Sequence, residues 1–251
     1  MPEEDTTDRT THFGYQTVTE DEKTRLVRGV FDRVASRYDL MNDLMSGGVH
    51  RLWKREMVAL INPRKGQIVL DLGGGTGDIA FRLRDAGAGE VTVCDINAEM
   101  LAVGRDRAID EGRDEGLTWV TGDAEQLPFP NRSFEGCTIA FALRNVTRID
   151  EGLRDSYRIL KPGSRFVCLE FSKVVLPGLQ ALYDQYSFKI LPVMGRIVAK
   201  DRDSYQYLAE SIRKFPPQAE LAARMEAVGF SRVGYRNLSG GIAALHWGWR
   251  I

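Results

Sequence analysis

The sequence predicts an α/β fold, a doubly wound and mostly parallel sheet with helices on both faces, and two observations lead to this prediction. From Gln67 onward, apolar strand-like runs alternate with amphipathic helical stretches, which is typical of βαβ units. The first of these strands ends in a glycine-rich turn before a helix, the order found in nucleotide-binding sheets. We therefore expect a Rossmann-like, seven-stranded sheet.

Two segments precede the expected sheet. Residues 1–18 are polar and rich in Thr, Asp and Glu, so we expect a flexible N-terminal tail. Residues 19–62 are expected to form an N-terminal helical cap. A capping box at Thr19 begins its first helix, which runs to about Tyr38, and its second helix is expected over 49–61, where Asn62-Pro63 ends it.

The expected sheet domain spans 63–251. Its strands are predicted at 67–72, 90–95, 117–121, 134–141, 165–171, 231–237 and 241–249. Helices are predicted over 78–86, 97–112 and 150–160, with a last one that follows Pro216-Pro217 and ends at Val228. Residues 174–215 interrupt the alternation with helical periodicity, so we expect a helical insertion there. Ser239-Gly240 is typical of a hairpin turn, and the last strand should therefore be antiparallel.

The composition excludes several classes of partner. The 34 Lys and Arg and 35 Asp and Glu residues are scattered and give a net charge of −1, so we expect no nucleic-acid partner. The three Cys and three His residues lack the spacing of metal ligands, so we expect no metal site. No signal-peptide core or run of about 18 apolar residues is present, which favours a cytoplasmic location, with attachment to the periphery of a membrane left open.

A glycine turn with the pattern Gly73-x-Gly75-x-Gly77 is the most informative segment. Glycine adopts positive φ without strain, and the absence of Cβ lets a ligand approach the backbone. The helix that begins at Asp78 leaves amide N–H groups free for a ligand carboxylate or phosphate. The pattern is not the G-x-G-x-x-G of dinucleotide sites, and no Lys-Ser/Thr follows as in a P-loop.

Two acids accompany this turn. Asp95 ends the next strand, 24 residues after Asp71, and suits a carboxylate that accepts both ribose hydroxyls of a nucleoside. Asp71, which ends the strand before the turn, suits a ligand ammonium group. A ligand with both groups is an amino-acid-bearing nucleoside, so the pattern indicates S-adenosylmethionine. An ordinary βαβ turn without a ligand is the alternative.

A third acid, Asp123, follows the next strand, with Ala124 beside it. Asp123 can accept a hydrogen bond from the adenine amine, Ala124 leaves room for the ring, and Ile96 can supply an apolar face to it. Taken alone, an Asp in this place is more often part of an Asx-turn or a helix cap. Because the three acids should share the carboxyl edge of the sheet, we favour a ligand site.

From about Phe13 to the C-terminus, the chain resembles the ubiquinone/menaquinone biosynthesis C-methyltransferases, a family of class I S-adenosylmethionine-dependent methyltransferases. The most specific segment is Tyr-Asp-Leu-Met-Asn-Asp-Leu-Met-Ser at 38–46, continued by His50 and Trp53. Further similar segments are 141–146, 158–163, 170–172 and 203–211. The resemblance implies the class I methyltransferase fold and cofactor contacts at Thr76, Asp95 and the pair Asp123-Ala124.

The family reaction implied by the resemblance methylates a ring carbon of a polyprenylated benzoquinol, demethylmenaquinol or both, with S-adenosylhomocysteine as product. We expect Arg144 to stabilise a phenolate oxygen or orient a water, and Asn145 to hold a hydroxyl. A surface salt bridge is the alternative for Arg144. Tyr38, Asn42 and His50 are expected to line the quinol pocket, although a structural role is equally open for His50.

The resemblance also bears on partners. A polyprenylated quinol is the expected substrate, and association with the inner membrane, with a quinone-biosynthesis complex or with a second copy as a homodimer is left open. Residues 174–199 are expected to form a tunnel or membrane-facing lid for the prenyl chain, with ordinary packing or a dimer contact as the alternative.

The sequence departs from the family pattern in four places. The family usually has Ser where this chain has Ala140, commonly Asn at Asp123, and commonly Gly at Ala142 and Ser164. One side-chain hydrogen bond to the cofactor is therefore expected to be missing at Ala140. Two alternatives for the function remain: a class I methyltransferase for another small molecule, such as a sterol or a phenolic metabolite, and a non-catalytic S-adenosylmethionine-binding scaffold.

Overall fold

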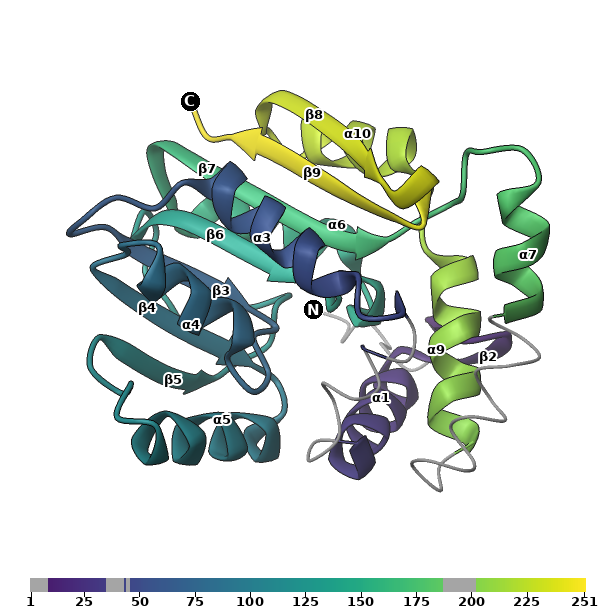
Figure 1. The fold of residues 1–251 in the computed structure, drawn as a ribbon, viewed down its shortest axis with the longest axis horizontal. Helices are drawn as coiled ribbons and strands as arrows, with labels where there is room; N and C mark the ends of the chain where they lie inside the picture. The colour runs from purple at the N-terminus through teal and green to yellow at the C-terminus, as the bar shows by residue number, and fades with distance from the viewer. Residues whose placement is uncertain (1–8, 35–42, 44–45, 187–201) are drawn as a thin grey trace, which may run out of the picture.

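The computed structural model describes residues 9–34, 43, 46–186 and 202–251. Within these ranges, seven strands form one sheet in the order β5-β4-β3-β6-β7-β9-β8, with helices on both faces (Figure 1). The pairs from β5 to β7 are parallel, whereas β9 runs antiparallel to both of its neighbours. The predicted sheet with an antiparallel last strand is confirmed. Its strands are β3 (Ile68–Leu72), β4 (Glu90–Asp95), β5 (Leu117–Thr121), β6 (Phe134–Ala140), β7 (Leu160–Phe171), β8 (Ser231–Leu238) and β9 (Ala243–Trp249).

The largest difference from the predicted strands is at β7, which begins at Leu160 rather than at Arg165. Leu160 already pairs with Phe134 of β6, and after a shift in register Arg165 pairs with Gly136. The Lys-Pro-Gly segment at 161–163, which lies between the predicted helix over 150–160 and the predicted strand at 165–171, is therefore the irregular beginning of this strand.

Each face of the sheet carries its own hydrophobic core, because alternate residues of a strand point to opposite faces. Val69 of β3 packs with the helices α3 (His50–Ile61) and α4 (Asp78–Asp85), whereas its neighbour Leu70 packs with α6 (Ile149–Ile159) and α10 (Gln218–Ala227). The helix α5 (Ala98–Asp110) packs on β4 and β5. The predicted helices of the sheet domain are thus confirmed to within two residues at each end.

The N-terminal segment differs from the expected tail. Residues 10–19 form a hairpin of β1 (Thr10–Phe13) and β2 (Gln16–Thr19). The Phe13 ring stacks on Tyr207 with the ring centres 4.2 Å apart, and the Tyr15 N–H donates to Glu210. Both partners belong to α9 (Arg202–Lys214). Contacts with a helix almost two hundred positions away order this polar segment, which its composition did not indicate.

Two helices form the expected cap region. The Glu22 N–H donates to Thr19 Oγ1 at 3.2 Å, so the predicted capping residue begins α1 (Glu20–Val34). The second helix, α3, lies across the sheet, and Asn62 ends it with φ +49°. In Figure 1, α1 stands beyond the carboxyl edge of the sheet beside α9, where Val27 and Val30 pack with Tyr207. The predicted extension of α1 to Tyr38 lies outside the described residues.

Within the expected insertion at 174–215, the structure describes a loop and turn at 174–178, followed by the helices α7 (Leu179–Gln185) and α9. Residues 187–201 lie outside the described part of the chain. None of the described helices is long and apolar enough to cross a bilayer.

The three cysteines of the sequence lie inside the sheet, in β4, β6 and β7. Cys94, Cys137 and Cys168 are all buried and free. Burial, together with nearby acidic groups, raises the pKa of each thiol above its ordinary value.

Candidate active site

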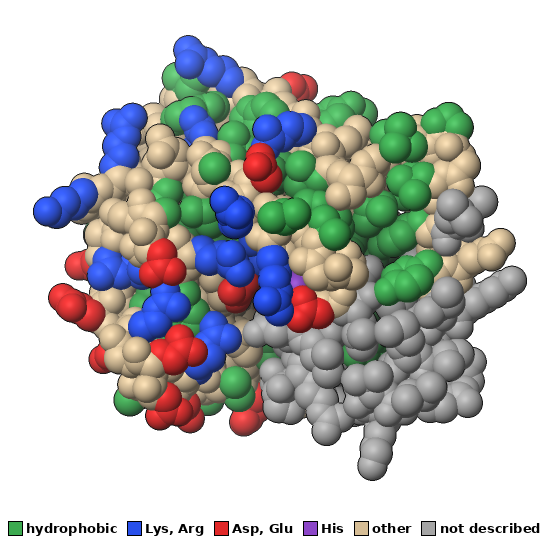
Figure 2. Space-filling view, viewed as in Figure 1, with side chains coloured by type: hydrophobic (Ala, Val, Ile, Leu, Met, Phe, Trp, Pro, Cys, Tyr) green, Lys and Arg blue, Asp and Glu red, His purple; other side chains and the backbone are tan. Residues whose placement is uncertain are grey.

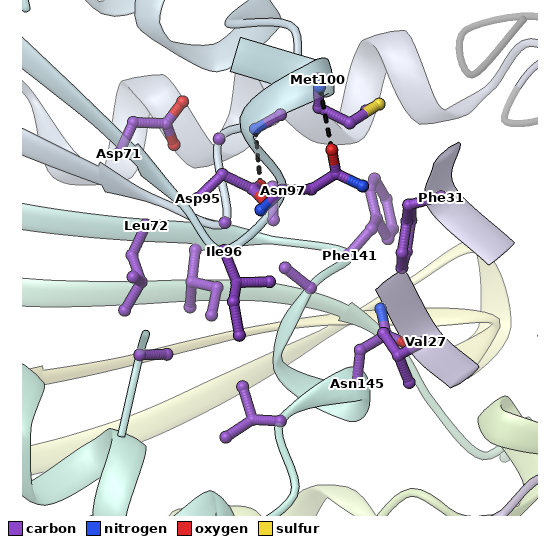
Figure 3. A pocket seen from close by; sticks show the side chains of 18 of the residues that line it. Val27, Phe31, Asp71, Leu72, Asp95, Ile96, Asn97, Met100, Phe141 and Asn145 are labelled. Carbon is purple, nitrogen blue, oxygen red and sulfur yellow. Dashed lines mark hydrogen bonds between the residues drawn. The ribbon is translucent and has the colours of Figure 1, made fainter. Parts of the chain in front are cut away.

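A cavity opens at the carboxyl edge of β3, β4 and β6 and extends beneath α1 (Figure 3). Its volume is about 1130 Å³, counting the open solvent at its mouth. The glycine turn and the segments that follow β4, β5 and β6 form its walls. The helix α1 contributes one face with the spacing i, i+3, i+4 and i+7, namely Thr24, Val27, Arg28 and Phe31. The three sequence-predicted acids therefore share one cavity with α1, a helix that the sequence predicted but did not place at the site.

The glycine turn has the predicted backbone, with φ of +60° at Gly73, +52° at Gly75 and +81° at Gly77. The space around two of these glycines is already taken by the protein. A Cβ at Gly73 would lie 2.4 Å from the Ala142 Cβ, and one at Gly77 would lie 2.6 Å from the Trp119 ring. At Gly73 and Gly77 the absence of Cβ therefore also allows close packing within the chain.

Asp95 is fixed by two backbone amides at the end of β4. Its Oδ2 accepts from the Gly75 N–H at 2.9 Å, and its Oδ1 accepts from the Asn97 N–H at 2.9 Å. Burial raises the Asp95 pKa, while these amides favour the charged form. Each carboxylate oxygen can still accept a second hydrogen bond, so Asp95 offers two oriented acceptors at the cavity wall. Ile96 lines the cavity next to it (Figure 3).

Asp71 is a buried acid with an incomplete set of hydrogen bonds. Its Oδ1 accepts from the Thr138 hydroxyl at 3.1 Å, whereas Oδ2 is buried and has no hydrogen-bond partner in the described part of the chain. Burial raises the Asp71 pKa to about 7. A lone buried carboxylate oxygen beside the cavity suits a cationic donor such as a ligand ammonium group.

The sequence left two roles for Asp123, a local Asx-turn or a contact with a ligand, and its position in the structure allows both. Its Oδ1 accepts from the Glu125 N–H at 2.9 Å, which is the contact of an Asx-turn. Asp123 and Ala124 also line the cavity, and Asp123 is exposed at its rim. Thr76 is buried and lines the same cavity. The Asx-turn therefore orients Asp123 without removing it from the site.

Sequence reasoning missed an ion pair in the cavity wall. Lys54 of α3 is 4% exposed, and its Nζ lies 2.8 Å from Asp78 Oδ2 at the start of α4. Burial opposes ionisation of Asp78, but the charge and hydrogen bond of Lys54, together with Arg82, lower its pKa to about 2. The sequence did carry a signal for this pair, because Lys54 lies on the otherwise apolar stripe of α3. A cation buried at such a position requires an acidic partner.

The structure contradicts the expected contact between Arg144 and a substrate. The Arg144 side chain is 1% exposed, and its Nη1 lies 2.8 Å from Glu170 Oε1. The same guanidinium donates to the Phe141 carbonyl, and the residue does not line the cavity. The alternative of a surface salt bridge is wrong as well, because the pair is fully buried. Glu170 stands within the apolar run of β7, and this was the signal that a buried cation had to face it.

Asn145 lines the cavity, as expected for an acceptor-side residue. Its Oδ1 accepts a hydrogen bond from the Tyr207 hydroxyl at 3.0 Å. Its Nδ2 is buried without a hydrogen-bond partner among the residues that the structure describes. Asn145 is thus the member of the predicted catalytic pair that reaches the cavity.

His50 does not line the described cavity. It is 3% exposed within α3, and its Nδ1 lies 3.0 Å from Ser46 Oγ. Burial, together with the nearby Lys54 charge, lowers the His50 pKa and favours the neutral ring. These contacts fit the structural role that the sequence left open, rather than a substrate contact. Tyr38 and Asn42, the other expected substrate residues, lie outside the described ranges.

The comparisons with known proteins agree with this architecture. The model of the ubiE/COQ5 methyltransferase family matches residues 16–250. A relative from Paracoccus denitrificans, named ubiquinone/menaquinone biosynthesis C-methyltransferase, is 59% identical and covers 96% of this chain and 97% of its own. A relative of the same name from Dinoroseobacter shibae is 55% identical and covers 98% of this chain and 99% of its own.

Two solved structures share the fold. One is an S-adenosylmethionine-dependent methyltransferase from Thermotoga maritima, 18% identical, with a TM-score of 0.65 over 90% of this chain and 100% of its own. The other is a phosphoethanolamine N-methyltransferase from Haemonchus contortus in complex with S-adenosylmethionine, 16% identical, with a TM-score of 0.61 over 79% of this chain and 52% of its own. The resemblance seen in the sequence is confirmed, and the chain belongs to the ubiE/COQ5 methyltransferase family.

Proposed function

We propose that this protein transfers a methyl group from S-adenosylmethionine to a ring carbon of a polyprenylated benzoquinol, of demethylmenaquinol or of both, and releases S-adenosylhomocysteine. The observation that carries the proposal is the match to the ubiE/COQ5 family over 16–250. The cavity adds independent support, because acceptors suited to a sugar and to an ammonium group converge on it at Asp95 and Asp71.

The residues present fit S-adenosylmethionine along the whole cofactor end of the cavity. Asp95 would hold the ribose hydroxyls, the unpartnered oxygen of Asp71 would hold the ammonium group, and Asp123 would accept from the adenine amine beside Ile96 and Ala124. Ala140 lines the cavity without a hydroxyl, so its side chain offers the cofactor no hydrogen bond. When bound, S-adenosylmethionine supplies a methyl group already activated by its sulfonium.

The chain itself mainly has to place the acceptor ring and keep the cavity dry. A bond forms between the ring carbon and the methyl carbon as the sulfur–carbon bond breaks, and the proton on that ring carbon then passes to water. Val27 and Phe31 of α1, together with Phe141, give the acceptor end an apolar wall (Figure 3). Holding the two reactants in line within this wall supplies much of the rate enhancement expected for such a transfer.

The test combines a binding measurement with an analysis of the quinone pool. Asp95→Ala removes two acceptors for the ribose, each worth about 1.5–3 kcal/mol for a charged group, so cofactor affinity should fall by about 100-fold or more. Asp106→Ala, an exposed acid on the neighbouring α5, is the matched control and should bind like the wild type. Calorimetry checks both, and wild-type protein that is folded but gives no heat with millimolar S-adenosylmethionine would contradict the proposal.

Deletion of the gene tests the substrate. Mass spectrometry should then show demethylated quinone precursors, and complementation with the Asp95→Ala variant should not restore the normal pool. An unchanged pool in the deletion strain would contradict a quinol substrate and favour another small molecule. Full restoration by a variant that no longer binds the cofactor would favour the scaffold alternative.

We also propose that the enzyme works in the cytoplasm and docks on the inner membrane, where a prenyl chain resides. Leu52 of α3 and the pair Val175-Leu176 after β7 are each more than half exposed. Both segments contact the same turn at 239–240. Trp53, which follows Leu52, donates a hydrogen bond to Ser239, and the Val175 N–H donates one to the Gly240 carbonyl. Figure 2 shows hydrophobic side chains gathered on the face that α3 crosses. Association with a second copy or with other enzymes of the pathway stays a prediction.

Sedimentation with phospholipid vesicles tests the docking surface. The double variant Leu52→Asp, Leu176→Asp should lose vesicle binding, because it would place two charges at the apolar boundary. Ile109→Asp is the control, since Ile109 is 58% exposed on α5. Equal binding by the double variant and the control would contradict docking through this face.

A further inference from the structure

Two polar side chains meet at the acceptor end of the cavity. Tyr207 of α9 is 5% exposed, and its hydroxyl donates to Asn145 Oδ1 at 3.0 Å. The Tyr207 ring stacks on Phe13 with an interplanar angle of 15° and packs with Val27 and Val30 of α1. Burial raises the Tyr207 pKa, so the hydroxyl keeps its proton. The Tyr207 hydroxyl that donates to Asn145 is therefore held in place by packing of its ring against Phe13 and against α1.

This contact sets the orientation of the Asn145 amide. A buried hydroxyl proton needs an acceptor, and the described contacts offer Asn145 Oδ1 for it. The amide nitrogen must then point the other way, where it is buried and has no hydrogen-bond partner among the residues described. In Figure 3 the Asn145 side chain lies beside Val27 of α1 at the cavity wall. The site thus holds an oriented N–H donor that lacks an acceptor.

The neighbouring Arg144 does not supply a hydrogen-bond donor to the cavity. Its guanidinium is committed to Glu170 and to the Phe141 carbonyl, beneath the wall of the cavity rather than within it. An unpaired amide donor gains most from a negatively charged oxygen. The proposed substrate carries such a group once a quinol hydroxyl loses its proton, and the phenolate form is also the one whose ring carbon attacks a methyl group.

We propose that Asn145 Nδ2 donates a hydrogen bond to the phenolate oxygen of the bound acceptor, and that Tyr207 is a positioning residue that holds the amide in this orientation. The inference rests on the proposed function and moves the phenolate role from Arg144 to Asn145. The hydroxyl proton passes to water, the ring carbon bonds to the methyl carbon as the sulfur–carbon bond breaks, and loss of the ring proton to water restores the aromatic ring.

A chromogenic phenol tests the donor without turnover. We would titrate 4-nitrophenol, bound to the protein saturated with S-adenosylhomocysteine, by the absorbance of its phenolate. The wild type should lower the probe's pKa by about one unit, as a donor to the anion requires. Asn145→Ala should abolish this shift, and Tyr207→Phe should reduce it. Tyr157→Phe removes a hydroxyl from α6, outside the cavity, and should behave like the wild type.

Turnover of the quinol separates positioning from a structural role. Tyr207→Phe keeps the ring that stacks on Phe13, so the variant should fold and bind the cofactor normally. Asn145→Ala should lower kcat about 100-fold at neutral pH with a small change in KM, as seen when a single oxyanion donor is removed, and Tyr207→Phe should lower kcat by a smaller factor. Because less of the acceptor would be ionised, their activity should recover toward higher pH. A purely structural role would lower the melting temperature without moving the pH profile.

Two outcomes would overturn the inference. The first is an equal probe pKa, or no binding of the probe, in all four proteins. The second is a pH profile of Asn145→Ala identical to that of Tyr157→Phe. If the wild type does not methylate the quinol but the probe titrates as expected, the proposed substrate fails while the donor assignment stands.

Discussion

The two ends of the cavity are built in different ways. At the proposed cofactor end, the walls come from consecutive strand ends and turns, and the backbone holds Asp95, which accepts from the Gly75 and Asn97 amides. At the proposed acceptor end, the walls come from α1 and the segment after β6, and Tyr207 of α9 supports Asn145 from behind, so that elements distant in the sequence meet there. The comparison teaches that local backbone geometry fixes the cofactor end, whereas long-range side-chain contacts fix the acceptor end.

The contacts of α1 illustrate the second kind of construction. Near its start, Lys23 Nζ donates to the Val146 carbonyl at 3.2 Å, and near its end Asp32 accepts from the Asn97 amide at 2.8 Å. Between these two contacts, Val27 and Phe31 cover the cavity. In the described part of the chain, these two hydrogen bonds tie α1 to the segments that follow β6 and β4.

The largest effect is expected from breaking the buried pair under the acceptor end. Glu170→Ala leaves the Arg144 guanidinium buried without its carboxylate, which should lower the free energy of unfolding by about 3–5 kcal/mol. Glu56→Ala breaks an exposed pair with Arg236 and serves as the control, with a loss of about 0–1 kcal/mol. Urea unfolding measures both, and similar losses in the two variants would contradict the buried pair.

A smaller effect, of opposite sign, is expected at the cofactor end. Burial raises the Asp71 pKa from 3.8 to about 7, so between these values the folded protein keeps a proton that the unfolded chain has lost. The unfolded state binds fewer protons, and the stability of the wild type should therefore fall as the pH rises through this range. Asp71→Asn removes this titrating group. The free energy of unfolding of the variant should therefore exceed that of the wild type by a difference that grows with pH, to about 2–4 kcal/mol at pH 7.

The same variant should bind the cofactor less well, because a cationic donor favours the charged carboxylate. Binding to the wild type near pH 7 should release protons, which calorimetry in buffers of different ionisation enthalpy detects. An Asp71→Asn variant whose stability follows the pH dependence of the wild type would show that Asp71 is ionised throughout and would contradict this account.

The smallest effect is expected where α1 meets the rest of the protein. Lys23→Met removes the hydrogen bond to the Val146 carbonyl, worth about 1 kcal/mol net. Amide exchange in α1 should become about fivefold faster and KM for the acceptor should rise, with unchanged affinity for the cofactor. The exposed Lys65→Met is the control. A change in cofactor affinity alone would contradict the separation of the two ends.

Most of the sheet and the cofactor end could be predicted from the sequence because their signals are local. The glycine turn, the acid that ends β4 and the hairpin before β9 each occupy a few consecutive residues. Their positive φ values and hydrogen bonds follow from those residues and their immediate neighbours. The start of β7, which differs most from the prediction, depends on pairing with a neighbouring strand across a register shift, which a single segment does not reveal.

The acceptor end was predicted less well because each of its features needs a distant partner. The polar hairpin at 10–19 is ordered by α9. Arg144 forms a buried ion pair with Glu170 beneath the cavity, and Lys54 forms an ion pair with Asp78 in the cavity wall. For Lys54 and Glu170 the sequence showed a polar residue within an apolar run, but not which residue would pair with it.

The three thiols buried in the sheet have a practical consequence. Cys94, Cys137 and Cys168 are the whole cysteine content of the chain, and in the folded state each is shielded from solvent and held in its unreactive protonated form. Alkylating reagents need the thiolate, so the three native cysteines should not react with them while the protein is folded. A cysteine introduced at Arg28 on α1, at the cavity wall, would then be the single position that carries a fluorophore or spin label, and it would report ligand binding there in real time.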